Sequence, residues 1–375
     1  MAAAERLELL VLQPTPFCNL DCDYCYLADR SSKARMPPAV LRRTFERVLA
    51  SRHVRGGFTV VWHAGEPLVA GIGFYEEAIA LLAELDTRGL EIHHSFQTNG
   101  TLVTRAWCDF FLRHRVRLGV SVDGPAFLHD AHRKTRGGTG THERVMAGVR
   151  CLQQHGVPFH VITVLTSASL DHPDELFAFY VENGIRRVGF NIEEVEGVNA
   201  SSSLAGHRAA ERTRAFFTRF VELLETTGAD LRVRELEGLG RLLTAGGPVE
   251  RNQENTALRI LAVDHSGNLA TWSPELLGQK TRDGGDFLLG NVMTDGLDDL
   301  EATPKFRRLA GEIERGVAAC RESCEYFGLC GGGSPSNKYF ENGTFASTET
   351  LHCRLSKQAI ADALLPRLES ALGVA

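Results

Sequence analysis

Several features of other protein classes are missing from this 375-residue sequence. No apolar run approaches the ~18–20 residues that a membrane-spanning helix needs, and no basic amphipathic helix stands out. The first residues, MAAAERLELLVLQ, lack the basic start and small-residue cleavage site of a signal peptide. The net charge of -6 disfavours a dedicated nucleic-acid binder, which is usually basic. We therefore expect a cytoplasmic protein without a membrane or nucleic-acid partner.

Cysteine, by contrast, is abundant, with nine residues in the chain. Seven of them form two clusters, one near each end, and Cys108 and Cys151 stand alone. Disulfides are rare in the cytosol, so clustered thiols indicate metal or iron–sulfur ligands. Cys108 and Cys151 lie in apolar stretches with helical periodicity, and we interpret them as core residues.

Short apolar runs alternate with amphipathic segments along the first 227 residues. The predicted strands are 7–13, 57–63, 91–97, 116–122, 158–165 and 186–192. The predicted helices lie near 38–52, 73–87, 103–114, 142–155, 173–183 and 206–227. Such alternation predicts parallel strands with crossover helices, and six units are fewer than the eight of a closed barrel. We predict an α/β fold with a partial (β/α)6 barrel, whose reactive groups lie at the carboxyl ends of the strands.

Three regions follow from these patterns. Residues 1–227 form the predicted barrel. Residues 228–305 form a bridging region with poor helix periodicity and a β-hairpin that turns at HSGN. Residues 306–375 form a small Cys-rich domain that ends in a helix, which Pro366 is expected to kink or divide.

The first cysteine cluster follows the first predicted strand with the spacing C-x3-C-x2-C. The thiolates of Cys18, Cys22 and Cys25 are suited to three irons of a cubane cluster, whose fourth iron then stays open to a chelating amino-carboxylate. Structural zinc is the alternative, but such a site requires four ligands. A histidine just after the third cysteine would support zinc, and Tyr26 stands there instead.

The segment CNLDCDYCYL resembles the signature loop of the radical S-adenosylmethionine (SAM) enzymes, which have a partial (β/α)6 barrel. Further segments resemble family motifs in the same order: AGEP at 64–67, TNG at 98–100, SVDGP at 121–125 and HDxxR from 129 to 133. Ala64 departs from the Gly-Gly-Glu-Pro pattern. The alternative interpretation is that AGEP and TNG are ordinary turns and that Arg133 is a surface arginine. The resemblance implies a SAM-binding [4Fe–4S] cluster on Cys18, Cys22 and Cys25, and SAM contacts from Gly65, Glu66, Pro67, Asn99, Ser121, Arg133 and Asn191.

The second cluster supplies four thiols, which satisfy either a [4Fe–4S] cluster or a four-thiolate zinc site: Cys320, Cys324, Cys330 and Cys353. This segment resembles the SPASM domain of peptide-modifying radical SAM enzymes, which in full carries two auxiliary clusters. Here residues 255–285 contain no cysteine, and Ser334 stands where a further ligand would fall. The resemblance therefore implies one auxiliary [4Fe–4S] cluster, with a structural metal staple as the alternative.

The segments WHAGEP and CEYFGLCGGGSPSNKYFENGTF resemble the SPASM maturases of Grr-, Xye- and Fxs-type precursors. Members of that branch form cyclophanes in ribosomally made peptides. The resemblance implies a radical SAM oxidoreductase that receives electrons from a donor such as flavodoxin or ferredoxin. A 5′-deoxyadenosyl radical removes a β-hydrogen from the precursor peptide, and the carbon radical joins an aromatic ring. The expected proton acceptors are Asp123, Glu193 and Glu194, although the last two also fit a solvated acidic loop.

Other outcomes remain open: thioether formation, epimerisation and sulfatase formylglycine maturation. The sulfatase type is expected to carry both auxiliary clusters. Outside enzymes, a zinc-stapled binding protein is the alternative. The first predicted strand begins within about ten residues of Met1, so no upstream leader-recognition domain is expected. The leader is expected to bind residues 228–305 by adding a strand, or to need a separate partner chain.

Overall fold

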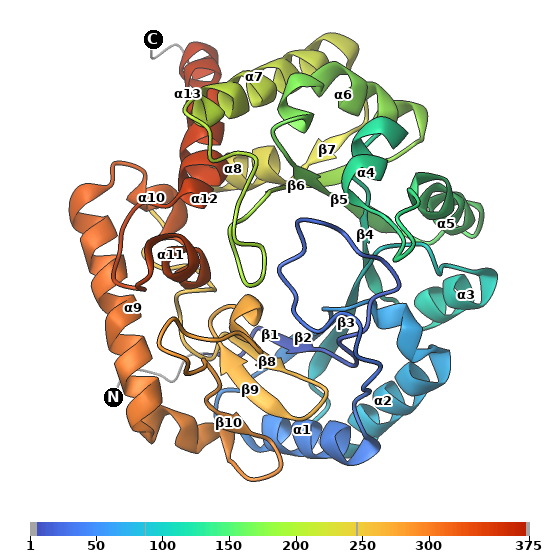
Figure 1. The fold of residues 1–375 in the computed structure, drawn as a ribbon, viewed down its shortest axis with the longest axis vertical. Coiled ribbons are helices and arrows are strands. Elements are labelled where there is room, and N and C mark those ends of the chain that lie inside the picture. The colour runs from blue at the N-terminus through green and yellow to red at the C-terminus, as the bar shows by residue number, and fades with distance from the viewer. Residues whose placement is uncertain (1–5, 87, 245–246, 373–375) are drawn as a thin grey trace.

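The chain folds around one sheet of ten strands, seen in a computed structural model that describes residues 6–86, 88–244 and 247–372. The strands lie in the order β10-β9-β8-β1-β2-β3-β4-β5-β6-β7 (Figure 1). Strands β1 to β6 are parallel. They span Leu9–Leu12, Gly57–Trp62, Glu91–Thr98, Arg117–Ser121, Phe159–Leu165 and Arg187–Ile192. This arrangement confirms the partial barrel, and every strand ends within two residues of its predicted range.

Helices surround these strands on the outside of the barrel (Figure 1). They are α1 Pro38–Ala50, α2 Ile72–Leu85, α3 Arg105–Arg113, α5 His142–Gln154, α6 Pro173–Glu182 and α7 Ala209–Thr227. All six agree with the predicted helices to within three residues. The short α4, Ala126–His132, was not predicted and begins directly after Pro125. No helix among the described residues is long and apolar enough to cross a bilayer.

The bridging region joins the sheet of the barrel. Its elements are β7 Arg232–Val233, α8 Arg234–Thr244, β8 Ile260–Val263, β9 Asn268–Thr271 and β10 Gly290–Asn291. Strands β8 and β9 form the predicted antiparallel hairpin. The pairing of β8 with β1, in which Leu9 lies opposite Ile260, was not predicted. Helix α8 was also missed, because Gly238 and Gly240 lower its helix propensity.

The C-terminal region packs against one side of the barrel (Figure 1). It contains α9 Pro304–Ser323, α10 Phe327–Cys330, α11 Pro335–Asn342, α12 Leu351–Cys353 and α13 Ala359–Leu372. Helix α13 packs on α7, where Arg367 forms a 3.1 Å ion pair with Glu222. Of the two expected effects of Pro366, a kink or a division of the last helix, division does not occur, because α13 continues through it. Pro366 is exposed, so water is available to the carbonyl that its missing N–H leaves unbonded.

The two faces of the sheet differ in chemistry. The Phe190 ring packs 5.4 Å from Phe216 of α7, on the helix-covered face. Successive side chains of a strand point to opposite faces, so Asn191 points into the barrel. The same alternation turns Phe96 toward Trp107 and directs Gln97 inward. The barrel interior therefore carries polar groups near the carboxyl ends of its strands.

Candidate active site

The first cysteine cluster lies on the loop after β1. The amide of Leu20 donates to Cys18 Sγ at 3.4 Å, and the Asn99 side chain lies 3.7 Å from the same sulfur. Arg30 Nη1 donates to the Cys22 carbonyl oxygen at 2.7 Å. Burial raises the pKa of Cys18 to about 12 and that of Cys22 to about 11. These thiols therefore keep their protons until a metal displaces them.

Glu66 ties the segment after β2 to the segment after β3. Its Oε1 accepts from Leu68 N at 2.9 Å and from Thr98 Oγ1 at 2.7 Å, while Oε2 accepts from Asn99 N at 2.8 Å. Glu66 is 1% exposed, and burial raises its pKa to about 6. Glu66 therefore holds Thr98 and Asn99 against the turn after β2.

The turn that precedes Glu66 has a left-handed backbone. Ala64 and Gly65 both have φ of 66°. A Cβ on Gly65 would lie 2.5 Å from the Thr15 carbonyl oxygen and 2.7 Å from that of Phe17, which itself accepts from Glu66 N at 2.8 Å. Only glycine allows this close approach to the loop that leads into Cys18. Ala64, which departs from the glycine pattern, adopts the strained conformation as well.

Asp123 and Arg133 form a buried ion pair below the cysteine loop. Arg133 Nε and Nη2 lie 2.9 and 3.1 Å from the two carboxylate oxygens of Asp123. The carboxylate also accepts from the hydroxyl of Tyr24 and from Val164 N. Burial opposes the charge of Asp123, but Arg133 outweighs it and lowers the pKa. Asp123 is thus a fixed anion, and Arg133 is committed to it. Burial is the larger effect on the pKa of the Cys22 thiol, and the positive charge of Arg133 opposes it by lowering that pKa.

Polar groups on the inner face of the sheet form a second part of the site. Gln97 Nε2 donates to Ser121 Oγ at 3.0 Å across β3 and β4. Arg234 of α8 donates to Asn191 Oδ1 at 2.8 Å. Asn191 and Arg234 line a cavity of about 330 Å³ that extends to His352. Asn191 thus lies at the end of β6 in a cavity shared with the C-terminal region.

The two carboxylates after β6 have different surroundings. Glu193 Oε2 accepts from Ser203 N at 2.9 Å and also contacts the Ser203 hydroxyl, so it holds the following loop. Glu194 Oε2 accepts from Asn337 Nδ2 at 2.8 Å, and its Oε1 lies 3.5 Å from His352 Nε2. Glu194 therefore connects the barrel to the Cys-rich region.

Three more acidic residues gather near Glu194 and were missed from the sequence. Burial, together with Glu194, raises the pKa of Glu196 well above its ordinary value. Burial and the charge of Glu254 raise the pKa of Glu275 to about 8, and burial raises that of Glu254. Of these three residues, only Glu196 is close to Glu194 in the sequence. No local sequence pattern therefore identifies the four glutamates as one group. Of these residues, Glu275 has a pKa near neutral pH.

The four cysteines of the C-terminal region surround one cavity of about 490 Å³, whose lining includes Cys320, Cys324, Cys330, Cys353, Ser334 and Lys338. Three consecutive glycines after Cys330 have φ of 63°, 104° and 73°. Asn252 Nδ2 donates to the carbonyl oxygens of Cys330 and Gly333 at 2.9 and 3.0 Å. A loop of the bridging region therefore fixes the backbone of this cavity.

Both cysteine groups fit clusters better than single ions. Four thiolates on one zinc ion place their sulfurs roughly 3.8 Å apart, given Zn–S bonds of about 2.3 Å. Among the described residues, neither group brings three ligand atoms within 4.8 Å of one another. A cubane spreads its ligand sulfurs over separate irons and suits this wider spacing.

Comparison with known proteins agrees with this geometry. Residues 12–180 match the model of the radical SAM superfamily. An uncharacterized protein of Synechocystis, sll1766, is 46% identical over 372 residues, which cover 98% of this chain and 94% of that protein. The chain belongs to the radical SAM superfamily. As a radical SAM enzyme, it uses SAM and a [4Fe–4S] cluster.

Other relatives have functional names. A serine-type anaerobic sulfatase-maturating enzyme of Klebsiella aerogenes is 35% identical over 184 residues, or 48% of this chain and 45% of that enzyme. That match thus spans about half of either protein. In three dimensions, anSMEcpe with bound AdoMet superimposes with a TM-score of 0.80 at 23% identity, over 97% of this chain and 99% of that one.

Streptococcus suis SuiB bound to its precursor peptide SuiA gives a TM-score of 0.65 at 16% identity, over 93% of this chain and 76% of SuiB. At these identities the two structures show the fold alone, including the SPASM-like C-terminal region.

Proposed function

We propose that this radical SAM enzyme modifies a ribosomally made peptide and forms a carbon–carbon cyclophane crosslink to an aromatic side chain. The observation that carries the proposal is the C-terminal cavity. Its four cysteines are suited to one fully ligated auxiliary cluster, and Glu194 reaches the same region from the barrel. Named relatives that act on sulfatases, and SuiB with its precursor peptide, support a peptide substrate.

Each cysteine group has its own role in this proposal. Cys18, Cys22 and Cys25 would hold the SAM-binding [4Fe–4S] cluster, which would supply the electron for SAM cleavage. Cys320, Cys324, Cys330 and Cys353 would hold the auxiliary cluster, which would supply electron transfer. An external one-electron donor such as flavodoxin or ferredoxin reduces the enzyme.

The SAM contacts follow the geometry after β2 to β4. The Glu66 carboxylate and the backbone around Gly65 and Pro67 accept from the ammonium group. Asn99 lies beside Cys18, and Ser121 lies on the inner face of the sheet beside Gln97. In this proposal both side chains contact the rest of the cofactor. Arg133 acts through its pair with Asp123 and keeps a positive charge near Cys22.

The crosslink removes two hydrogens from the peptide. When bound, SAM and the reduced cluster would supply a radical able to take a hydrogen atom from a β-carbon of the substrate. After the new bond forms, the aromatic ring must lose one proton and one electron. The chain must supply the proton acceptor, and either cluster would serve as the electron acceptor.

Glu194 is the proton acceptor that we favour among the three predicted residues. Asp123 accepts four hydrogen bonds and is locked in its ion pair. Glu193 holds the following loop through Oε2. Glu194 lies near Glu196, Glu254 and Glu275, whose pKa values are raised by burial, so these neighbouring carboxyls favour the protonated form. Replacement of Glu194 by Gln should lower crosslinking more than SAM cleavage.

The leader of the precursor binds the bridging region in this proposal. Strand β10 lies at the outer edge of the sheet, with β9 on its other side. An extended peptide can add a strand to such an edge. Deletion of the leader should abolish turnover; unchanged turnover would exclude this mode of recognition.

The test uses the anaerobically reconstituted full chain with SAM, a reductant and a precursor peptide that carries aromatic-x-x repeats. We expect a product that has lost two hydrogens and lacks fragment ions within one three-residue segment. Deuterium on the substrate β-carbon should appear in 5′-deoxyadenosine. The variant with Cys18, Cys22 and Cys25 changed to Ala is the control and should show neither product.

Sulfatase maturation is the second candidate, because the named curated relatives include anaerobic sulfatase-maturating enzymes. The absence of cysteine from residues 255–285 separates this chain from the expected pattern of two auxiliary clusters. A sulfatase peptide with Ser or Cys at its modification position should yield no aldehyde. An aldehyde there, without a crosslink in the aromatic peptide, would reject the cyclophane proposal.

A further inference from the structure

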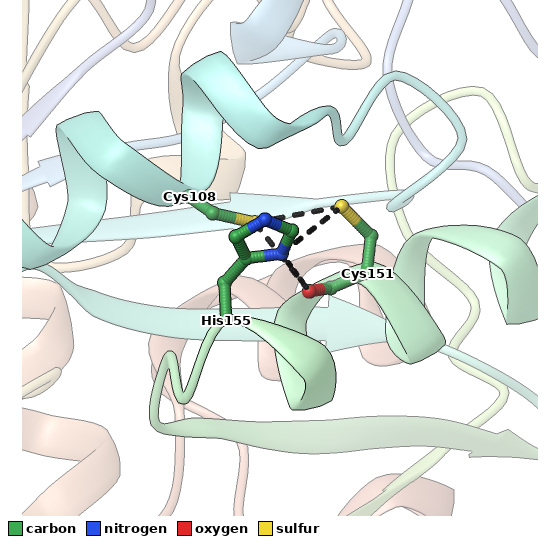
Figure 2. Close-up of side chains that lie close together, drawn as sticks. All are labelled: Cys108, Cys151 and His155. Atoms are coloured by element: carbon green, nitrogen blue, oxygen red, sulfur yellow. Dashed lines mark hydrogen bonds between the residues drawn. The ribbon is translucent and has the colours of Figure 1, made fainter.

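A compact group of two thiols and one imidazole lies outside the two cysteine clusters. Cys108 belongs to α3, Cys151 lies in the last turn of α5, and His155 ends that helix (Figure 2). The Sγ atoms of Cys108 and Cys151 are 3.7 Å apart, and Cys151 Sγ lies 3.9 Å from His155 Nδ1. All three side chains therefore meet between the two helices.

The sequence brings them together through helix geometry. Cys151 and His155 are four residues apart and so share one face of α5. Helix α3 packs on α5 and buries Cys108 completely beside Phe110 and Phe111. His155 Nδ1 lies 2.9 Å from the Cys151 carbonyl oxygen. This hydrogen bond orients the ring, and Nδ1 exchanges it for a metal ion on binding. Cys151 and His155 are half-buried, which leaves an entry path from solvent.

The distances suit a single soft metal ion. Zinc bonds of about 2.3 Å to sulfur and about 2.0 Å to nitrogen place tetrahedral ligand atoms roughly 3.5–3.8 Å apart. The two measured separations, 3.7 and 3.9 Å, are close to these values. Among the described residues, this is the one trio of Cys, His, Asp or Glu whose ligand atoms all lie within 4.8 Å of each other.

We propose that Cys108, Cys151 and His155 bind one zinc ion, with water as the fourth ligand. Both thiols give up their protons on binding, so two thiolates balance the charge of the ion. The ion ties α3 to α5 on the outer ring of helices, away from the C-terminal cluster region (Figure 1). Its role is structural, and it is separate from the radical chemistry.

The test uses the full chain with its clusters already reconstituted, so that zinc does not compete for their cysteines. The protein is incubated anaerobically with Zn²⁺ and desalted into a weak chelator, and zinc is measured by mass spectrometry. We expect about one more zinc per chain in the parent than in Cys151→Ser or His155→Ala. His114→Ala is the matched control, because His114 also ends a helix but pairs with Glu76. It should retain the zinc of the parent.

A second measurement reads the site directly. Peptide mapping after treatment with N-ethylmaleimide reports how fast Cys151 is alkylated. Zinc should slow this reaction at least tenfold in the parent and in His114→Ala, and should have little effect in His155→Ala. Equal zinc content in all variants, or alkylation that zinc does not change, would overturn the proposal. A Cys108–Cys151 disulfide in place of bound zinc would do the same.

Discussion

Lys338 Nζ lies 3.3 Å from Cys320 Sγ, at a position where the lysine is 3% exposed. Its second contact is the Gly316 carbonyl oxygen at 2.9 Å. A buried lysine that donates to a proposed cluster ligand stabilises the reduced, more negative state. The two residues come from α9 and α11, so the packing of these helices helps to set the potential of the auxiliary cluster.

Replacement of Lys338 by Met removes this donor and keeps much of the side-chain volume. We expect the auxiliary cluster to become harder to reduce, by roughly 60 mV for each ~1.4 kcal/mol of lost stabilisation. Redox titration followed by electron paramagnetic resonance measures this shift. Lys338→Arg, which keeps donor and charge, should restore most of it. An unchanged potential in Lys338→Met at full iron content would show that the contact has no electronic effect.

The iron content of the reconstituted chain tests the number of clusters. We expect about eight irons per chain, and about four after Cys18, Cys22 and Cys25 are changed to Ala. Changing Cys320, Cys324, Cys330 and Cys353 to Ala should also leave about four irons, in the cluster that cleaves SAM. About four irons and one zinc in the parent would instead make the C-terminal site a structural staple.

Gly65→Ala should disrupt SAM binding. The new Cβ would lie 2.5 Å from the Thr15 carbonyl oxygen, so the loop before Cys18 must move. We expect SAM affinity to fall at least tenfold, measured by equilibrium dialysis of the reconstituted protein. Gly228→Ala is the control, because Gly228 also has a left-handed backbone but nothing within 4 Å of the added atom. It should cost about 1–2 kcal/mol of stability and leave SAM affinity unchanged.

The raised pKa of Glu275 gives stability a definite pH dependence. Burial and Glu254 raise this pKa to about 8. At a pH between the ordinary pKa of a glutamate and this raised value, Glu275 is protonated in the folded chain and ionised in the unfolded chain. Between these two values the folded state binds more protons, and stability falls as pH rises. Urea unfolding from pH 5 to pH 8 should show a shallower decline in Glu275→Gln than in the parent. Identical slopes would mean that Glu275 is ionised in the folded protein.

Much of the barrel was predictable because its strands and helices are locally encoded. Most of the six strands are short apolar runs, and the crossover helices have apolar stripes, so sequence periodicity located these elements. Motifs at the ends of β1, β2 and β3 also predicted that Cys18, Glu66 and Asn99 converge, because parallel strands end at one edge of the sheet.

Features that depend on long-range packing were not predictable. The acidic group joins Glu194 and Glu196 to Glu254 and Glu275, which lie far away in the sequence. No local sequence pattern predicts the pairing of β8 with β1 either. Likewise, Cys108 and Cys151 each look like isolated core residues until α3 and α5 pack together.

The position of β1 has a consequence for how the chain folds. This strand lies between β2 and β8, so one of its edges is completed by residues made some 250 positions later. Until then, backbone groups of β1 are exposed on the side that β8 will cover. Such delayed pairing is slow to form and invites association between nascent chains. A fragment that ends at residue 227 would keep that edge open, and we expect it to aggregate where the full chain does not.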